Sequence, residues 1–386
     1  MTELQLEKML SKVEKPGRYV GGELNSVYKD KSKVDVRFAF CFPDNYEVGM
    51  SHLGIKILYS CLNEMENVWC ERCFAPWEDM EAQLRENNIP LFALESRDPL
   101  GDFDFIGFTM QYELSYTNVL SMLDLANVPI FAKDRQNDHP IVVMGGPCTY
   151  NPEPLADFAD IFSLGEGEEA LCELCELYAK HKKAGFDRKK FLHAAATELS
   201  GFYVPSLYDV SYNDNGTISA ITPKDGAPEK ITKRIIKDLD KASYPDRFVV
   251  PFTEVIHDRA VEEIFRGCIR GCRFCQAGYI YRPIREKSPD VINAQAKSIC
   301  DKCGYEELSL CSLSTSDYKR LPELLSDMLD WTEKDKVGIS LPSLRVDNFP
   351  ESLMRRIQSV RKSGLTFAPE AGTQRLRDVI NKNITE

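Results

Sequence analysis

Apolar and polar positions follow two alternating periods along residues 34–185 of the chain. Short, almost wholly apolar runs typical of buried strands are separated by longer stretches with apolar residues at helical spacing. Strands are predicted at residues 34–42, 68–74, 90–94, 103–109, 141–144 and 160–164. The clearest helices are predicted at residues 50–63 and 166–180. Because strands that alternate with helices pair in parallel, we expect a doubly wound parallel sheet with helices on both faces.

Glycines stand where the last strands of this sheet are expected to end. Gly145 and Gly146 follow one predicted strand, and Gly165 and Gly167 follow the next. Ligands of open α/β sheets bind at the carboxyl ends of the strands. These glycines therefore predict the edge of the sheet at which a ligand would bind.

The strand–helix alternation stops at residue 186 and resumes at residue 260. The intervening stretch contains turn signals such as Pro205 and Gly216, and we expect a connector with a small hairpin there. Four strand–helix units follow, with strands at 260–267, 307–313, 337–343 and 364–370 and helices at 289–303, 318–331, 351–362 and 374–381. This order predicts an incomplete (β/α) barrel.

The pattern divides the chain into four parts. We expect an N-terminal helix and extension at 1–33, an α/β domain at 34–185, a connector at 186–255 and a barrel segment at 256–386. Because four strand–helix units cannot close a barrel, we expect the sequence to be a fragment of a longer chain.

Composition narrows the class of protein. The chain is 43% hydrophobic and 28% charged, and no apolar run approaches the roughly 20 residues that span a membrane. The charged, amphipathic N-terminus is unlike a signal peptide, so we expect a cytoplasmic protein. A net charge of −12 gives no indication of nucleic-acid binding. The thirteen cysteines are expected to be reduced, as core residues, metal ligands or catalytic thiols.

The strongest chemical signal is the loop that follows the strand at 260–267. Cys268, Cys272 and Cys275 are spaced so that each can bind one iron of a cubane cluster, which leaves the fourth iron open. Open coordination sites are a mark of chemistry. Gly267 and Gly271 permit tight bends, and three arginines, Arg266, Arg270 and Arg273, supply positive charge. The alternatives are zinc, which lacks a fourth His or Cys before Cys300, and unliganded core cysteines.

The run Cys-x3-Cys-x-Phe-Cys, with Phe274 as its aromatic residue, resembles the signature of the radical S-adenosylmethionine (radical SAM) superfamily. It also follows the first barrel strand, as in that family. The resemblance implies a 4Fe-4S cluster whose open iron binds S-adenosylmethionine and whose electron cleaves it to a 5′-deoxyadenosyl radical. It further implies an electron donor such as a flavodoxin or ferredoxin.

The same resemblance implies where the chain contacts S-adenosylmethionine. Backbone groups just after the cysteine loop, around Phe274, Ala277 and Gly278, would face the adenine. Polar residues at later strand ends would bind the methionine and ribose, and here these are Ser312, Ser314, Asp317, Ser343, Arg345 and Glu370. For each of these polar residues, capping of the local loop is the open alternative.

Three further cysteine pairs share a C-x2-C spacing: Cys70 and Cys73, Cys172 and Cys175, and Cys300 and Cys303. No partner pair stands at a zinc-like spacing from them, and we expect them to be packed thiols. They do not predict a second cluster.

Residues 34–185 resemble the cobalamin-binding-like domain that precedes the barrel in one subgroup of the superfamily. In cobalamin modules an Asp-x-His-x-x-Gly loop supplies a His to cobalt, and here Asp44 and Gly49 match while Tyr46 replaces the His. The lone His52 is expected to be structural. Cobalamin bound without this ligand and a fold that no longer holds cobalamin both stay open.

Two functions from different classes follow. The first is a radical SAM enzyme of unknown substrate, for which methylation, methylthiolation and rearrangement are the candidate reactions. The second is an iron–sulfur or redox-sensing scaffold module without catalysis. The unfinished barrel leaves the activity of this fragment open.

Overall fold

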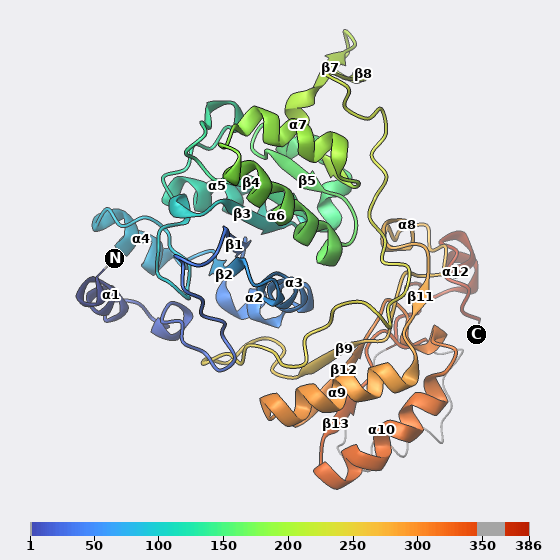
Figure 1. Cartoon of the computed structure of the whole chain (residues 1–386). Helices are drawn as coiled ribbons and strands as arrows, with labels where there is room; N and C mark the ends of the chain where they lie inside the picture. Colours follow the sequence, from blue (N-terminus) through green and yellow to red (C-terminus); the bar gives the residue numbers. More distant parts are fainter. Residues whose placement is uncertain (1, 346–366, 386) are drawn as a thin grey trace. The chain divides into compact units, whose positions relative to one another are not determined.

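The computed structural model describes residues 2–345 and 367–385 of the chain (Figure 1). It divides into two compact units. Unit 1 comprises Met1–Ile235 and Val249–Ile256, and unit 2 comprises Ile236–Phe248 and His257–Glu386. None of the helices in the described ranges has the length and apolar character of a membrane span.

Unit 1 is built on a six-stranded sheet in the order β2-β1-β3-β4-β5-β6. The strands are β1 (Val36–Phe42), β2 (Val68–Phe74), β3 (Phe105–Thr109), β4 (Ile141–Gly145), β5 (Ile161–Ser163) and β6 (Phe202–Tyr203). The first five pair in parallel, and β6 is antiparallel to β5. The predicted doubly wound parallel sheet is therefore confirmed.

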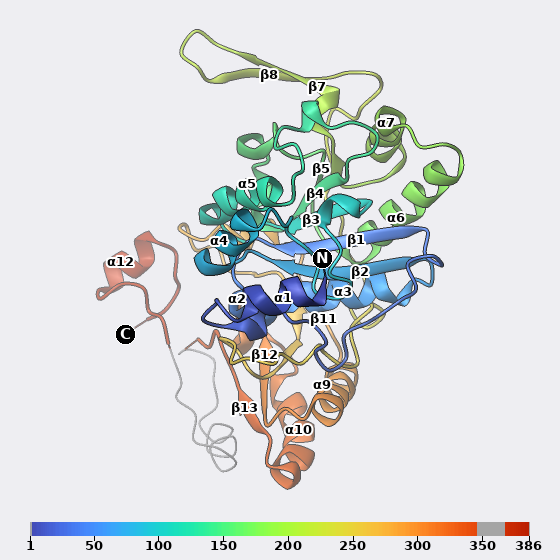
Figure 2. The ribbon, with the colours of Figure 1, turned by 90° about the vertical axis from the view of Figure 1, so that its left-hand side faces the viewer.

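Helices cover both faces of this sheet (Figure 2). One face packs against α3 (Leu53–Glu64), α6 (Gly167–Lys183) and α7 (Arg188–Glu198), and the other against α1 (Glu3–Leu10), α4 (Glu78–Glu86) and α5 (Tyr116–Leu125). The cause is the two-residue period of a strand: Phe38 and Phe40 join the first core, whereas Ala39 and Cys41 join the second. The short α2 (Tyr46–Ser51) follows β1 directly.

The strand predicted at 90–94 is wrong. Leu91, Phe92 and Leu94 are buried, as they would be in a strand, but their backbone groups bond to different segments of the chain. The amide of Leu91 donates to the carbonyl of Leu125, that of Leu94 donates to Arg72, and Phe92 forms only an isolated bridge with Pro99. Burial therefore arises from packing of an irregular segment and not from a ladder.

The stretch expected as a connector holds more structure than the sequence indicated. The predicted hairpin is present as β7 (Tyr208–Tyr212) and β8 (Ile218–Pro223). In addition, β6 forms the last strand of the unit 1 sheet and α7 packs on one face of that sheet. Neither element was predicted. Short 3-10 helices of unit 1 are η1 (Pro16–Arg18), η2 (Leu100–Asp102), η3 (Glu113–Ser115), η4 (Ala132–Asp134), η5 (Pro147–Tyr150), η6 (Glu153–Leu155) and η7 (Pro205–Leu207).

Unit 2 contains a parallel sheet in the order β13-β12-β9, formed by β9 (Ala260–Glu263), β12 (Glu307–Cys311) and β13 (Gly338–Ser340). The long helices α9 (Pro289–Cys303) and α10 (Leu321–Asp335) follow the first two strands. Smaller elements are β10 (Phe265–Arg266), α8 (Ala277–Ile280), β11 (Arg285–Glu286), η8 (Thr315–Asp317) and α12 (Gln374–Val379). This is the start of the predicted (β/α) barrel.

Parts of the third and fourth predicted strand–helix units lie outside the described residues. The helix expected at 351–362 lies outside them, and so does the first part of the strand expected at 364–370. Leu344 and Phe367 form an isolated parallel bridge at that position. Along β12, Leu308 and Leu310 are fully buried with the helices, so the more polar Ser309 and Cys311 lie on the opposite face of the sheet.

Candidate functional site

The three cysteines lie on the loop after β10, and all three are partly exposed. The loop opens at Gly267, whose φ is +92°. A Cβ at this residue would lie 2.8 Å from the carbonyl oxygen of Pro283 and 2.9 Å from that of Tyr281. Only glycine accommodates both the backbone conformation and this close approach.

Arg282 holds the first part of the loop. Its guanidinium donates to the carbonyl oxygens of Cys268 (3.1 Å), Ile269 (3.4 Å) and Arg270 (3.0 Å). One side chain thereby fixes three successive peptide groups. No sequence motif singles this arginine out, because the contact closes a turn whose shape a pattern of residues does not show.

The second part of the loop is held by the segment that ends α12. The side-chain amide of Asn381 donates to the carbonyl of Gly271 at 2.8 Å. The amide of Arg273 donates to the carbonyl of Ile380 at 3.0 Å, and its guanidinium donates to Val379 at 2.6 Å. Residues more than a hundred positions away thus shape the interval between Cys272 and Cys275.

A partly buried ion pair joins the cysteine loop to η8, which follows β12. The guanidinium of Arg270 makes two contacts with Asp317, of which Nε to Oδ2 measures 2.9 Å. The hydroxyl of Ser314 donates to the same Oδ2 at 2.7 Å. Burial acts to raise the pKa of Asp317, but the hydrogen bonds from Arg270 and Ser314 outweigh it and hold that pKa below its usual value. The carboxylate therefore stays charged and keeps the loop in place.

A cavity of about 420 Å³ opens beside this pair, within the range typical of small-molecule sites. It is lined by Phe265, Cys268, Ile269, Ile284, Glu286, Ser314, Asp317 and Lys319. Of the residues predicted from the sequence, it brings together Cys268, Ser314 and Asp317. Phe265, Ile284, Glu286 and Lys319 were not predicted, since they become neighbours only through the β10–β11 pairing and the turn after η8.

Other predicted contacts bond elsewhere in the protein and do not line the cavity. The Ser312 hydroxyl lies 3.0 Å from that of Thr315. Glu370 pairs with Lys382 at 3.1 Å. Arg345 is buried, and its guanidinium donates to the carbonyl of Asn383 at 3.1 Å. These contacts match the loop-capping alternative.

The remaining predicted residues also lie away from the cavity lining. Phe274 is 56% exposed, and the ammonium of Lys382 stands 6.0 Å from its ring centroid. Ala277 and Gly278 begin α8, where a Cβ at Gly278 would lie 3.0 Å from the carbonyl oxygen of Arg270. Ser343 is exposed with a φ of +59°.

The donor set of the cysteine loop fits a multi-iron cluster. Over residues 2–345 and 367–385, no three His, Cys, Asp or Glu side chains converge on a point where one metal ion could be held. In a cubane cluster each thiolate binds a different iron, and the ligands therefore stand apart around it.

The other cysteine pairs are packed, as expected. Cys70 and Cys73 are buried on opposite faces of β2, because three residues along a strand reverse the side-chain direction. Burial raises the pKa of Cys172 to about 11 and that of Cys300 to about 12. These thiols are protonated at neutral pH, unlike metal ligands.

In unit 1, Tyr46 points into the core and not toward a ligand. It is 1% exposed, its hydroxyl donates to Glu23 at 2.9 Å, and its ring meets that of Phe74 edge-on at 5.2 Å. Burial lowers the pKa of His52 to about 4, and its ring packs at 5.3 Å from that of Phe42. Neither residue is presented as a metal ligand.

The predicted ligand-binding edge of the sheet does contain a small cavity. It measures about 60 Å³, and Gly145, Gly146, Gly165 and Gly167 all line it. Gly165 has a φ of +103°, and a Cβ there would lie 2.2 Å from the carbonyl oxygen of Arg234. The backbone at this strand end therefore requires glycine.

Comparisons with known proteins agree with this architecture. A family model described as "Radical SAM proteins, N-terminal" matches residues 54–205, and one described as "Radical SAM superfamily" matches residues 263–386. The sequence is 28% identical to the uncharacterized protein MJ0966 of Methanocaldococcus jannaschii over 366 residues. That match covers 92% of this chain and 65% of the relative.

A solved structure of OxsB shows the same fold. The cobalamin-dependent S-adenosylmethionine radical enzyme OxsB, with aqua-cobalamin and S-adenosylmethionine bound, matches with a TM-score of 0.59 and 14% identity, covering 91% of this chain and 46% of OxsB. The radical S-adenosylmethionine methyltransferase TsrM of Kitasatospora setae matches with a TM-score of 0.49 and 13% identity, covering 84% of this chain and 59% of TsrM. The chain spans less than two thirds of the length of each of these proteins.

A parallel α/β unit followed by a partial barrel with a three-cysteine loop defines a radical SAM architecture of the kind that carries an N-terminal cobalamin-binding-like fold. The two matched models together span most of the chain. The protein belongs to the radical SAM superfamily.

Proposed function

We propose that Cys268, Cys272 and Cys275 hold a 4Fe-4S cluster and that the protein reductively cleaves S-adenosylmethionine. The observation that carries the proposal is the cavity of about 420 Å³, which places Cys268 beside Ser314 and Asp317. When bound and reduced by a flavodoxin or ferredoxin, the cluster supplies one electron that breaks the sulfur–C5′ bond, releasing methionine and a 5′-deoxyadenosyl radical.

The chain's own residues provide binding and orientation. The lining of the cavity carries both signs of charge, with Glu286 and Asp317 as anions and Lys319 as a cation. S-adenosylmethionine has a cationic amine and sulfonium and an anionic carboxylate, so Glu286 and Lys319 can each face an opposite charge, while Asp317 is already paired with Arg270. Phe265, Ile269 and Ile284 supply the apolar part of the wall and exclude water.

Anaerobic reconstitution with iron and sulfide tests the proposal. We expect about four irons per chain, and 5′-deoxyadenosine when dithionite and S-adenosylmethionine are added. A cluster without cleavage would favour the iron–sulfur scaffold module, and a chain that takes up no iron would overturn both functions. Methylation, methylthiolation and rearrangement are separated by mass spectrometry of the products formed from candidate substrates.

Asp317→Asn is expected to weaken both S-adenosylmethionine binding and retention of the cluster. The substitution replaces the charged partner of Arg270 with a neutral one, and hydrogen bonds to charged groups are worth about 1.5–3 kcal/mol. We expect KM for S-adenosylmethionine to rise about tenfold and the iron content to fall. The matched control is Asp330→Asn, an exposed aspartate on α10. Unchanged KM and iron content would show that this pair does not position the loop.

For unit 1 we propose a cobalamin-like fold in which no residue of the Asp44–Gly49 loop binds cobalt. The support is the burial of Tyr46 against Glu23 at the position where cobalamin modules carry a His. Corrin absorption bands after incubation with hydroxocobalamin would report binding. A shift of these bands on Tyr46→Phe would contradict the assignment of Tyr46 to the core.

A further inference from the structure

Exposed apolar side chains of unit 2 gather around the cysteine loop. Large apolar side chains are exposed on the loop itself, on α8 and the turn after it, and on α12, namely Ile269, Phe274, Tyr279, Tyr281, Leu376 and Val379. The long helices α9 and α10, both described along their whole length, contribute none. Apolar side chains that gather on one exposed surface mark a site of interaction.

The part of this surface on α12 lies away from the cavity of about 420 Å³. Leu376 and Val379 are 40% and 48% exposed, and at a spacing of three they share one face of the helix. Arg273 joins them to the cysteine loop, because its guanidinium donates to the carbonyl of Val379 at 2.6 Å. Ile269 lines the cavity, whereas no residue of α12 does. The α12 side is therefore open to a partner even when the cavity holds a ligand.

The same surface is basic in a chain that is acidic as a whole. Residues 266–285 contain five arginines and no aspartate or glutamate, although the net charge of the chain is −12. Two of the five pair with carboxylates of unit 2. Arg273 is exposed and donates to a backbone carbonyl, which leaves its charge in place. Arg375 is exposed and makes no ion pair with any described residue, and Asp378 is the one acidic residue of α12.

The inference rests on the proposed function, in which an electron must reach the cluster from outside the chain. The electron has to enter beside the cysteine loop, where the surface is both basic and apolar. We propose that the surface shared by this loop, α8 and α12 docks a flavodoxin, a small acidic protein that carries single electrons on a flavin. This docking face consists of Arg273, Tyr279, Arg375, Leu376 and Val379.

The docking face suits a weak and short-lived complex. Electron-transfer complexes bury less than about 1,200 Å² in total, so a face of a few residues is sufficient. Tyrosine and arginine are enriched at the centre of protein interfaces, and Tyr279 is 68% exposed, with the guanidinium of Arg282 5.8 Å from its ring centroid. In the docked complex one electron passes from the reduced flavin to the cluster. The flavin is oxidised by one electron, and no covalent bond forms or breaks.

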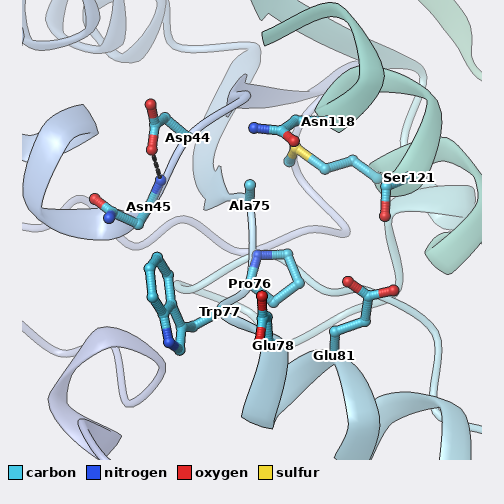
Figure 3. Close-up of a pocket in the computed structure, with 10 residues that line it drawn as sticks. Asp44, Asn45, Ala75, Pro76, Trp77, Glu78, Glu81, Asn118 and Ser121 are labelled. Atoms are coloured by element: carbon cyan, nitrogen blue, oxygen red, sulfur yellow. Dashed lines mark hydrogen bonds between the residues drawn. The ribbon is translucent and has the colours of Figure 1, made fainter. Parts of the chain in front are cut away.

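A surface of unit 1 has the opposite charge. A cavity of about 290 Å³ at the carboxyl ends of β1 and β2 is lined by Asp44, Glu78 and Glu81 and by no lysine or arginine (Figure 3). Glu81 pairs with Arg85 at 2.9 Å, but the other two carboxylates also line the space. An acidic carrier is repelled there and attracted to the docking face, so the charge distribution of the chain selects where it binds.

Binding of flavodoxin to the reconstituted full chain, measured by biolayer interferometry, tests the docking face. The affinity of the parent should fall as NaCl concentration rises, because the attraction is screened by salt. Arg375→Glu should weaken binding about tenfold at low salt, since it removes an attraction and adds a repulsion. Arg375→Gln removes the attraction alone and should weaken binding about threefold. Leu376→Ser should weaken binding without changing its dependence on salt.

The matched control is Lys334→Glu, which reverses the charge of an exposed lysine on α10. This variant should bind flavodoxin like the parent. Equal weakening by Lys334→Glu and Arg375→Glu would show an effect of net charge and overturn the docking face. The same conclusion would follow if the parent did not bind or if Arg375→Glu bound as tightly as the parent.

Cleavage of S-adenosylmethionine separates this inference from the proposed function. Dithionite is a small reductant that needs no docking, so Arg375→Glu should form 5′-deoxyadenosine at the parental rate with dithionite. With photoreduced flavodoxin at low salt, its rate should fall about tenfold. An equal loss with both reductants would assign Arg375 to the integrity of the cysteine loop and contradict docking. A parent that forms no product with dithionite would refute the proposed function, whereas the binding measurement would still decide the docking face.

Discussion

Replacing any one of Cys268, Cys272 and Cys275 with alanine is expected to abolish both the cluster and all formation of 5′-deoxyadenosine. In the proposed cluster each thiolate would bind a separate iron, so the loss of one would remove a third of the protein ligands. Iron and sulfide analysis, the visible spectrum and product chromatography would measure the loss, which we expect to reach background.

Cys172→Ala is the matched control for these variants. Cys172 is also partly exposed, but it lies in α6 of unit 1 with its pKa raised to about 11 by burial. Its replacement should leave the iron content and cleavage unchanged. Full iron content in Cys272→Ala would contradict the assignment of the loop, and an equal loss in Cys172→Ala would point to damage of the fold.

Some elements follow directly from the sequence pattern. β2 has the predicted bounds, Val68–Phe74, and α9 likewise spans Pro289–Cys303 as predicted. Helix α9 begins with Pro289 after the capping Ser288 and ends before Gly304, whose φ is +73°, so its ends are encoded locally. Where the caps and the periodicity agree, tertiary contacts add nothing that is needed to define the element.

Other elements depend on contacts that the sequence does not show. Helix α7 was missed because its apolar residues include the consecutive run from Ala194 to Ala196, which obscures the helical spacing. The strand at 90–94 was predicted wrongly for a different reason. Its apolar residues fill the core under a loop, and the backbone bonds to Leu125 and Arg72 on two different elements.

The candidate site likewise combines features that the sequence predicts with contacts that only the structure shows. The spacing of three cysteines and two glycines is local, and it predicted the loop and its chemistry. Arg282 and Asn381 hold the loop through its carbonyl groups, and such contacts leave no signature in the spacing of residues. Asp317 was placed by the end of β12, but its pairing with Arg270 became visible only in the structure.

Lys287→Met is expected to destabilise unit 2 by about 3–5 kcal/mol, because it leaves a buried carboxylate without its counter-charge. Glu262 on β9 is fully buried, and its Oε1 lies 2.8 Å from the ammonium of Lys287, whose side chain is 1% exposed. That ammonium also donates to Gln295 at 2.8 Å and stands 3.7 Å from the ring centroid of Tyr244. Urea unfolding followed by Trp331 fluorescence would measure the loss.

The matched control is Lys297→Met on α9. Lys297 is 45% exposed in its side chain and pairs with Asp301 at 3.2 Å. Exposed ion pairs are worth about 0–1 kcal/mol, so this variant should stay within 1 kcal/mol of the parent. Equal effects of the two substitutions would show that loss of any lysine, and not loss of the buried pair, lowers stability.

The effect of Lys287→Met should depend on pH through Glu262. Burial raises the pKa of Glu262 to about 7, although Lys287 acts to lower it. A carboxyl whose pKa is raised on folding contributes stability that is fully present below its ordinary pKa and lost as pH rises through its folded value. The free energy of unfolding of the parent should therefore fall between about pH 5 and pH 8, and Glu262→Gln should remove this dependence.

The penalty of Lys287→Met should be largest above pH 7 and shrink in acid, where Glu262 binds a proton and no charge is left unpaired. A penalty that is constant with pH would show that Lys287 stabilises unit 2 by packing alone.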